Sequence, residues 1–351
     1  MTALLTRRRF MKATAAGPAA VPSMIRAQTG SQTLIDGRTF RGTRLPDGSG
    51  VDGGTAIWAE SDTLIRNCHF LNLGNGAIRL FHSATANFTI EDCDVSNMYR
   101  FIENWSWDHP SVAAPVSDFA IRRVVATGLE RNFLRIRYGS TRGVIEDVVA
   151  HGNGQCSNYC VGFALDDEAN DIVYRRVEAH DFSETRRAAD RYWNGDGFSD
   201  ERGNRQIRYY SCVATGCSDG GFDVKSAGVY LEDCRASGNK RNYRLWNSGI
   251  LKNCRSENPV KNGGTGEVAH FAFFGGSGAN YMFDRPVVRA AAGNTAPIFF
   301  FQTDTPATIS IYDADIDAPD APLIQVDGPA PTIQWFPDRS QQKIRVARDM
   351  A

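Results

Sequence analysis

The segment 194–249 repeats one pattern three times, as NGDGFSDE (194–201), SDGGFDVKS (218–226) and NKRNYRLWNSG (239–249). Each copy lies next to a short run of residues that favour β-strands. The first two copies carry aspartates around the aromatic residue, and the third has Arg244 where one of those acids would fall. Because like charges at equivalent places of a repeat repel each other, the pattern indicates that a positively charged group binds there.

A wider repeat surrounds this segment: a hydrophobic residue, two variable residues, then Cys or Val. It occurs at 65–68, 90–93, 121–124, 145–148, 209–212, 231–234 and 251–254. A period of roughly 20–30 residues is typical of a solenoid. The units are rich in β-branched and aromatic residues, and no segment shows an apolar stripe of helical spacing. We therefore predict an all-β, single-domain parallel β-helix, with loops inserted where the spacing between repeats is longer.

The N-terminus reads as a targeting signal. Residues 6–12, TRRRFMK, resemble the twin-arginine export signal, and an Ala-rich stretch at 13–25 leads to a cleavage site at Arg26-Ala27. We predict a signal peptide at residues 1–27 and the β-helix at residues 28–351, with irregular coils from about residue 295. The protein is then expected in the periplasm or outside the cell. No run of about 18 apolar residues occurs, so we expect no membrane span.

The net charge and the cysteines indicate which partners and which bonds to expect. The chain has 39 Lys and Arg against 40 Asp and Glu, and the predicted leader is purely basic, so the remainder is acidic. A nucleic-acid partner is not expected on this balance, and we expect a monomer. Five of the eight cysteines share the repeat position and predict an inward-facing stack. Cys156 and Cys160 lie in a loop, where they could pair after export.

The aromatic residues Phe198, Phe222 and Tyr243 fix the register of the three copies. If their rings point into the core, alternation sends each following residue outward, and adjacent coils stack about 4.8 Å apart. Extended back along the chain, the outward column comprises Arg79, Glu103, Arg135, Ala164, Ser199, Asp223 and Arg244.

Three carboxylates are expected to meet near this column. Asp196 and Asp219 enter the turn before the strand, one coil apart, and Asp223 follows Asp219 by four residues. Carboxylate oxygens are the ligands that Ca²⁺ prefers. The sequence therefore predicts a metal site made by Asp196, Asp219 and Asp223.

NGDGF followed one coil later by SDGGFD resembles the calcium-site signature of the family-nine polysaccharide lyases, which are right-handed parallel β-helix pectate lyases. The resemblance is strongest over residues 190–256 and implies a right-handed coil and Ca²⁺ as cofactor. It carries over to Asp196, Asp219 and Asp223, whereas the family's fourth aspartate is Gly220 here. Arg244 stands where the family has its catalytic lysine.

Cleavage of a uronate polymer by β-elimination begins when a base removes the C5 proton, α to the carboxylate; the bond at O4 then breaks. A bound Ca²⁺ would stabilise the enolate-like transition state. Arg244 is either the base or a bidentate clamp for a carboxylate. A guanidinium is a poor base unless its pKa is lowered, and if Arg244 is the clamp, Lys225 or Lys240 is the base.

Further residues of the same segments are candidates for substrate binding, with solvated surface charge or ring packing as the alternative for each. They are Arg135, Arg137, Asp166, Asp167 and Trp246.

The leading hypothesis is an exported polysaccharide lyase that cleaves an acidic polysaccharide such as pectate with the help of calcium. A glycoside hydrolase with paired carboxylates is one alternative, and a C5-epimerase, which starts with the same proton abstraction, is another. A non-catalytic β-helix that binds glycans is the third, because fold alone does not establish chemistry.

Overall fold

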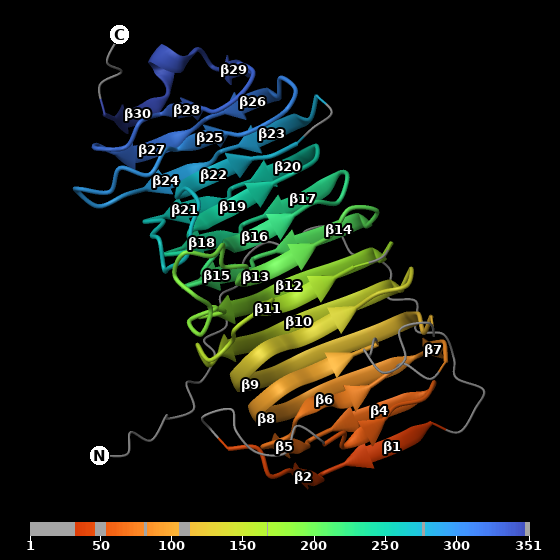
Figure 1. Ribbon diagram of the computed structural model, residues 1–351. Helices are drawn as coiled ribbons and strands as arrows, with labels where there is room; N and C mark the ends of the chain where they lie inside the picture. Colours follow the sequence, from red (N-terminus) through yellow and green to blue (C-terminus); the bar gives the residue numbers. More distant parts are fainter. Residues whose placement is uncertain are drawn as a thin grey trace, which may run out of the picture. The chain divides into compact units, whose positions relative to one another are not determined.

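The computed structural model describes residues 32–45, 54–80, 83–104, 113–166, 168–275 and 278–347. The predicted signal peptide, Asp167 and the last four residues lie outside this part. Within the described residues, thirty strands stack as successive coils, and the pairings between them are parallel (Figure 1). The predicted parallel β-helix is thus confirmed. One 3₁₀ helix, η1 (Arg339–Gln341), interrupts the strands, and no helix of the described residues is long and apolar enough to span a bilayer.

Strands at the same position in successive coils pair with each other and form three faces. The long strands β8, β9, β10 and β12 run through more than one face. The first face contains β1 (Thr33–Asp36), β4 (Thr63–Arg66), β7 (Thr85–Ala86), β8 (Phe88–Glu103), β9 (Val116–Ile136), β10 (Thr141–Gly152), β12 (Asn170–His180), β14 (Arg205–Tyr210), β17 (Val229–Glu232), β20 (Gly249–Lys252), β23 (Asn280–Asp284), β26 (Thr308–Tyr312) and β29 (Thr332–Phe336). The second contains β2 (Thr39–Arg41), β5 (His69–Leu71), β15 (Val213–Thr215), β18 (Arg235–Ser237), β21 (Arg255–Glu257), β24 (Val287–Arg289), β27 (Asp315–Ala318) and β30 (Lys343–Val346). The third contains β3 (Ile57–Trp58), β6 (Asn75–Arg79), β11 (Val161–Leu165), β13 (Asp196–Asp200), β16 (Gly220–Val224), β19 (Arg241–Leu245), β22 (Ala269–Phe273), β25 (Phe299–Phe301) and β28 (Ile324–Val326).

The hydrophobic-x-x-Cys repeat packs the inside of the coil. Ile121 pairs with Ile90 and Ile145 in the neighbouring coils, and Val124 pairs in the same way with Cys93 and Val148. All of them are buried. Similar side chains stack on one another here because successive coils approach to strand spacing and place equivalent positions in contact.

Aromatic residues stack inside the third face, as the register predicts. The ring centroids of Phe198 and Phe222 lie 4.8 Å apart, and those of Phe222 and Tyr243 lie 5.2 Å apart. Phe163 and Phe271 extend the stack at 5.1 and 5.0 Å. These rings lock the register of β11 to β22, which is what aligns the residues on the outer side.

The residue before each Cys or Val turns the chain between the first and second faces. Asp92, Arg123 and Asp147 adopt left-handed backbone angles, with φ of 54°, 52° and 55°, a conformation in which Asn and Asp are enriched. Their side chains bond between coils: Arg123 Nε donates to Asp92 Oδ1 at 2.7 Å, and Asn253 Nδ2 donates to Asp233 Oδ1 at 2.9 Å. The polar side chains at this position therefore form a structural ladder.

The coils after residue 295 keep the same strand order, although the sequence predicts irregular coils there. β25, β26 and β27 pair with β28, β29 and β30, one on each face. In register, Ile311 continues the hydrophobic position of Leu251 and Phe283, and buried Ala314 stands at the Cys position.

Candidate active site

The outer side of the third face carries the predicted column. Arg79, Glu103 and Arg135 are paired in successive coils, and the column continues by pairing through Ala164, Ser199, Asp223 and Arg244. A second outward column lies three residues earlier on each coil and includes Asp196, Gly220 and Arg241.

Arg244 lies between two carboxylates. Its Nη1 is 3.0 Å from Asp219 Oδ2 and 3.2 Å from Asp223 Oδ2. Asp223 Oδ2 is also 2.8 Å from Lys225 Nζ, and Asp223 Oδ1 accepts a hydrogen bond from Trp246 Nε1 at 2.7 Å. Both aspartates are at most 2% exposed, whereas Arg244 and Lys225 retain 13% exposure. The two cations therefore cover the acids and face the outside.

The second carboxylate, Asp219, holds a tyrosine that the sequence analysis missed. The Tyr192 hydroxyl lies 2.6 Å from each carboxylate oxygen of Asp219. Arg241 Nη1 donates to the Tyr192 oxygen at 2.7 Å and to Asp219 Oδ1 at 2.9 Å. Tyr192 belongs to the loop between β12 and β13, outside the repeat, and its sequence signal is only its place in RYW just before NGDGF.

Lys240, predicted as a possible base, lies beneath the site. Its ammonium group is fully buried, donates to the carbonyls of Trp193 at 3.3 Å and Thr265 at 3.1 Å, and lies 3.5 Å from Asp219 Oδ1. It also lies 4.0 Å from the centre of the Tyr192 ring. Burial lowers the pKa of Lys240, against the pull of Asp219. Lys240 thus joins the Tyr192 loop to the loop between β21 and β22 and does not face the outside.

Two glycines let the loop between β21 and β22 pack closely against the loop that carries Tyr192. A Cβ on Gly263 would lie 2.1 Å from the Trp193 ring, and one on Gly264 would lie 2.7 Å from it. Both have positive φ, 134° and 64°. The segment NGGTGE (262–267) therefore wraps the side chain next to Tyr192 and fixes the position of the loop.

Asp196 turns toward the backbone of the next coil. Its Oδ1 accepts a hydrogen bond from Gly220 N at 2.6 Å. Burial, together with the charges of Asp223 and Asp219, raises the pKa of Asp196 well above its ordinary value. A Cβ on Gly220 would lie 2.9 Å from Asp196 Oδ1 and 3.0 Å from the Asp223 Cβ. The place of the family's fourth aspartate is therefore crowded.

This arrangement does not fit a calcium ion. Asp219 and Asp223 are bonded to Arg241, Arg244 and Lys225, so protein cations already neutralise the oxygens that would bind the metal. Among the described residues, no three or more acidic, His or Cys side chains gather as a possible metal site. Calcium stays a prediction from the resemblance.

The pKa values of Arg244 and Lys225 indicate whether either residue could act as the base that removes the C5 proton. Burial works against the charge of Arg244, but Asp223 and Asp219 outweigh it and raise the pKa of this guanidinium. Asp223 and Glu201 likewise outweigh burial and raise the pKa of Lys225. Both groups are therefore protonated at neutral pH, which favours Arg244 as a carboxylate clamp over Arg244 as a base.

The other predicted residues that the structure describes lie on strands of the third face or directly after them. Arg135 Nε donates to Asp166 Oδ2 at 3.0 Å, and Arg137 Nε lies 3.4 Å from the same oxygen. They form a partly exposed basic cluster four coils from Arg244. The Trp246 ring packs on Phe274 at 4.9 Å, with the Arg244 guanidinium 4.8 Å away, so protein groups already engage it. Asp167 lies outside the described residues.

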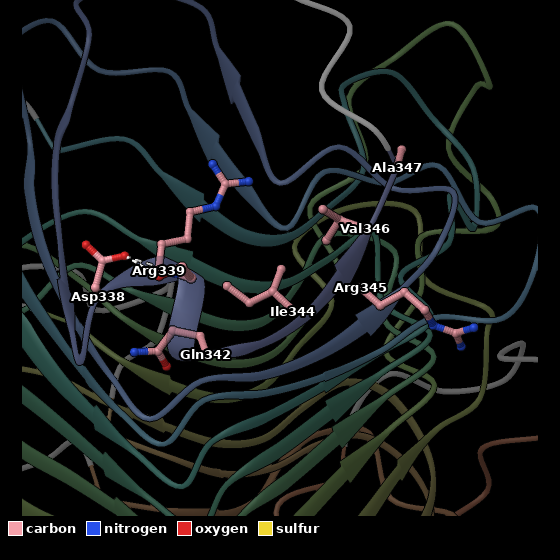
Figure 2. A pocket seen from close by; sticks show the side chains of 8 residues that line it. Asp338, Arg339, Gln342, Ile344, Arg345, Val346 and Ala347 are labelled. Atoms are coloured by element: carbon pink, nitrogen blue, oxygen red, sulfur yellow. Dashed lines mark hydrogen bonds between the residues drawn. The ribbon is translucent and has the colours of Figure 1, made fainter.

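A cavity of about 720 Å³ lies elsewhere, on the last coil. Figure 2 shows its lining from η1 and β30, including Asp338, Arg339 and Arg345. It shares no residue with the predicted site. Its position on the terminal coil makes it a feature of the solenoid end, and the outer side of the third face remains the candidate site.

Comparison with solved structures finds a similar coil in two enzymes of Azotobacter vinelandii. The A-module of mannuronan C-5 epimerase AlgE4 matches with a TM-score of 0.57 and 13% sequence identity, covering 87% of this chain and 91% of that chain. The A-module of mannuronan C-5 epimerase AlgE6 matches with a TM-score of 0.50 and 11% identity, covering 92% of each. The chain shares their fold. No protein-family model and no curated protein matches the chain, so the lyase-family resemblance stays a prediction.

Proposed function

We propose that this protein is an enzyme that acts on a uronate-containing polysaccharide by removing the proton at C5, with epimerisation at C5 as its outcome. The observation that carries the proposal is the junction at Arg244, where two proton-carrying pairs meet: Tyr192 with Asp219, and Lys225 with Asp223. The fold shared with the two mannuronan C-5 epimerase modules supports the same substrate class.

Arg244 clamps the carboxylate of the reacting sugar. A guanidinium presents two parallel N–H donors to a carboxylate, and this one is charged and partly exposed. Neutralising that carboxylate lowers the cost of the negative charge that spreads into it when the C5 proton leaves. Arg241 and Lys225 add positive charge around the same point.

Tyr192 removes the proton. Its hydroxyl is hydrogen-bonded to Asp219, so Tyr192 can accept the C5 proton while its own proton passes to that carboxylate. Burial and the charge of Asp219 raise the pKa of Tyr192, while Arg244 and Arg241 oppose the rise. Free tyrosinate therefore does not accumulate, and the transfer requires Asp219 as acceptor.

The fate of the carbanion decides the product. Epimerisation requires a second group that returns a proton to C5 from the other side, and protonated Lys225, bound to Asp223 and Glu201, supplies that group. If the O4 bond breaks first, the product is an unsaturated sugar and the enzyme is a lyase. Both outcomes can use a second proton carrier, because the departing O4 also needs a proton; the fold shared with the two mannuronan C-5 epimerase modules is what favours the epimerase over the lyase.

Reaction in deuterated water distinguishes these outcomes. Polymannuronate and polygalacturonate are incubated separately with the enzyme, with added calcium and with a chelator, and the products are examined by NMR and ultraviolet absorbance. We expect deuterium at C5 with inverted configuration. An unsaturated chromophore would indicate the lyase, and new reducing ends without it a hydrolase. No change in any uronate polymer under either condition would contradict the proposal.

A further inference from the structure

The outward column of the third face extends far beyond the candidate active site. Trp58 on β3 pairs with Arg79 on β6, and the pairing continues through Glu103 and Arg135 toward Arg244. Seven coil steps separate Trp58 from Arg244, roughly 34 Å at the usual spacing of strands. A linear polymer lying along this face therefore passes over both ends of the column.

The far end carries an exposed aromatic ring next to a guanidinium. Trp58 is 47% exposed, whereas its neighbour Ile57 is buried in the core. The Arg79 guanidinium lies 5.5 Å from the centre of the Trp58 ring. Tryptophan is an amphipathic ring typical of binding surfaces. Such a ring stacks on the flat face of a sugar, and the adjacent guanidinium can pair with that sugar's carboxylate.

A buried acid supports the arginines of this end. Glu103 is fully buried, lies in register between Arg79 and Arg135, and pairs with Arg100 at 3.2 Å. Burial raises the pKa of Glu103, and the nearby arginines, Arg100 foremost, oppose the rise. Glu103 thus lies inside, and Arg79 and Arg135 beside it supply positive charge that would attract an anionic ligand on the outer side.

We propose that Trp58 and Arg79 form a remote subsite that binds one uronate residue of the polymer, seven coils from the reacting sugar. This inference rests on the proposed function. The subsite adds affinity only when the substrate is long enough to reach from Arg244 to Trp58. The enzyme consequently prefers long chains, and short oligomers bind without this contribution.

Calorimetry with oligouronates of graded length tests the subsite. Binding is measured in a Tyr192→Phe background, so that the ligand is not converted, with and without Trp58→Ala or Arg79→Gln. We expect Trp58→Ala to weaken binding of oligomers longer than the span about tenfold, by analogy with the strength of aromatic contacts, and to leave short oligomers unchanged. Arg79→Gln should also reduce the salt dependence of binding. Phe336→Ala, an exposed aromatic on the first face, is the matched control.

The outcomes separate this inference from the proposed function. If long oligouronates bind and Trp58→Ala, folded by circular dichroism, binds them equally well, the subsite is wrong and the active site stands. Equal losses for short and long oligomers would also overturn it, because the effect would then come from the site at Arg244. If the protein that retains Trp58 binds no oligouronate of any length, both proposals fail.

Discussion

The Tyr192 hydroxyl lies 2.6 Å from both carboxylate oxygens of Asp219, and Arg241 donates to the same hydroxyl at 2.7 Å. The three residues come from a loop, a turn and a strand of different coils. A tyrosine held between an acceptor and a cation is suited to proton transfer, because its proton has a defined destination and the resulting charge has a partner.

Replacing Tyr192 with Phe should abolish turnover while the fold is retained. The ring keeps its packing and only the hydroxyl is lost, so we expect turnover to fall by about 10²-fold or more, the usual contribution of a positioned acid–base group. Isotope incorporation at C5 measures the loss. Tyr210→Phe, on the first face, serves as the control and should retain full activity. Unchanged turnover in the Tyr192 variant would exclude this residue as the proton carrier.

Arg244→Lys should weaken substrate binding more than it slows the chemical step. Lysine keeps the charge but cannot make two parallel bonds to a carboxylate. We expect KM to rise about 10-fold to 100-fold, the range for losing a hydrogen bond to a charged group. Steady-state kinetics on a uronate polymer measures the change. A large drop in kcat at constant KM would instead support Arg244 as the base.

Lys240→Met should destabilise the protein. The substitution leaves Asp219 with one cation fewer and deprives the carbonyls of Trp193 and Thr265 of their donor. Removing one partner of a buried ion pair costs about 3–5 kcal/mol, and urea denaturation would measure it. Lys252→Met, which removes a surface pair with Glu232, should lower the free energy of unfolding far less, because solvent screens an exposed ion pair. An equal loss of unfolding free energy in the two variants would show that the buried contacts of Lys240 stabilise the protein no more than a surface ion pair.

Gly220→Asp, which restores the fourth aspartate of the lyase signature, should not create a calcium site. The new side chain would meet Asp196 Oδ1 at 2.9 Å from its Cβ and would add charge next to two buried acids. We expect a less stable protein without calcium binding in calorimetry. Gly220→Ala separates crowding from charge. Calcium binding with stabilisation in Gly220→Asp would contradict this expectation and would support the predicted metal site.

Stability should fall between about pH 4 and pH 6 because of Asp200. Burial raises the pKa of this carboxyl to about 6, although the backbone N–H groups of Ser226 and Lys225 donate to it. The folded protein binds the proton more tightly than the unfolded chain, so the stabilisation is complete below the unfolded pKa and is lost as the pH rises through the folded value. A shift from 3.8 to about 6 corresponds to about 3 kcal/mol.

Asp200→Asn tests this dependence, because asparagine is uncharged at every pH. Urea denaturation at several pH values should show the unsubstituted protein losing stability relative to the variant over this window. A constant difference between the two would mean that Asp200 has the same pKa in the folded and unfolded protein.

The sequence predicted the coil, its register and the outward column because these depend on local periodicity. The aromatic residues and the Cys or Val positions recur once per coil, and parallel stacking then fixes which side chains lie next to each other. Arg79, Glu103 and Arg135 could be placed in this way several coils from the motif.

The tertiary structure decided what surrounds the three aspartates. Tyr192 reaches Asp219 from a loop without the repeat, and the conformation of that loop depends on distant contacts, such as those of Gly263 with Trp193 and of Lys240 with the Trp193 carbonyl. Sequence could bring the acids to one neighbourhood, but it could not tell whether a metal or arginine and lysine side chains neutralise them. That choice depends on side-chain geometry between coils, and it is made only when the chain has folded.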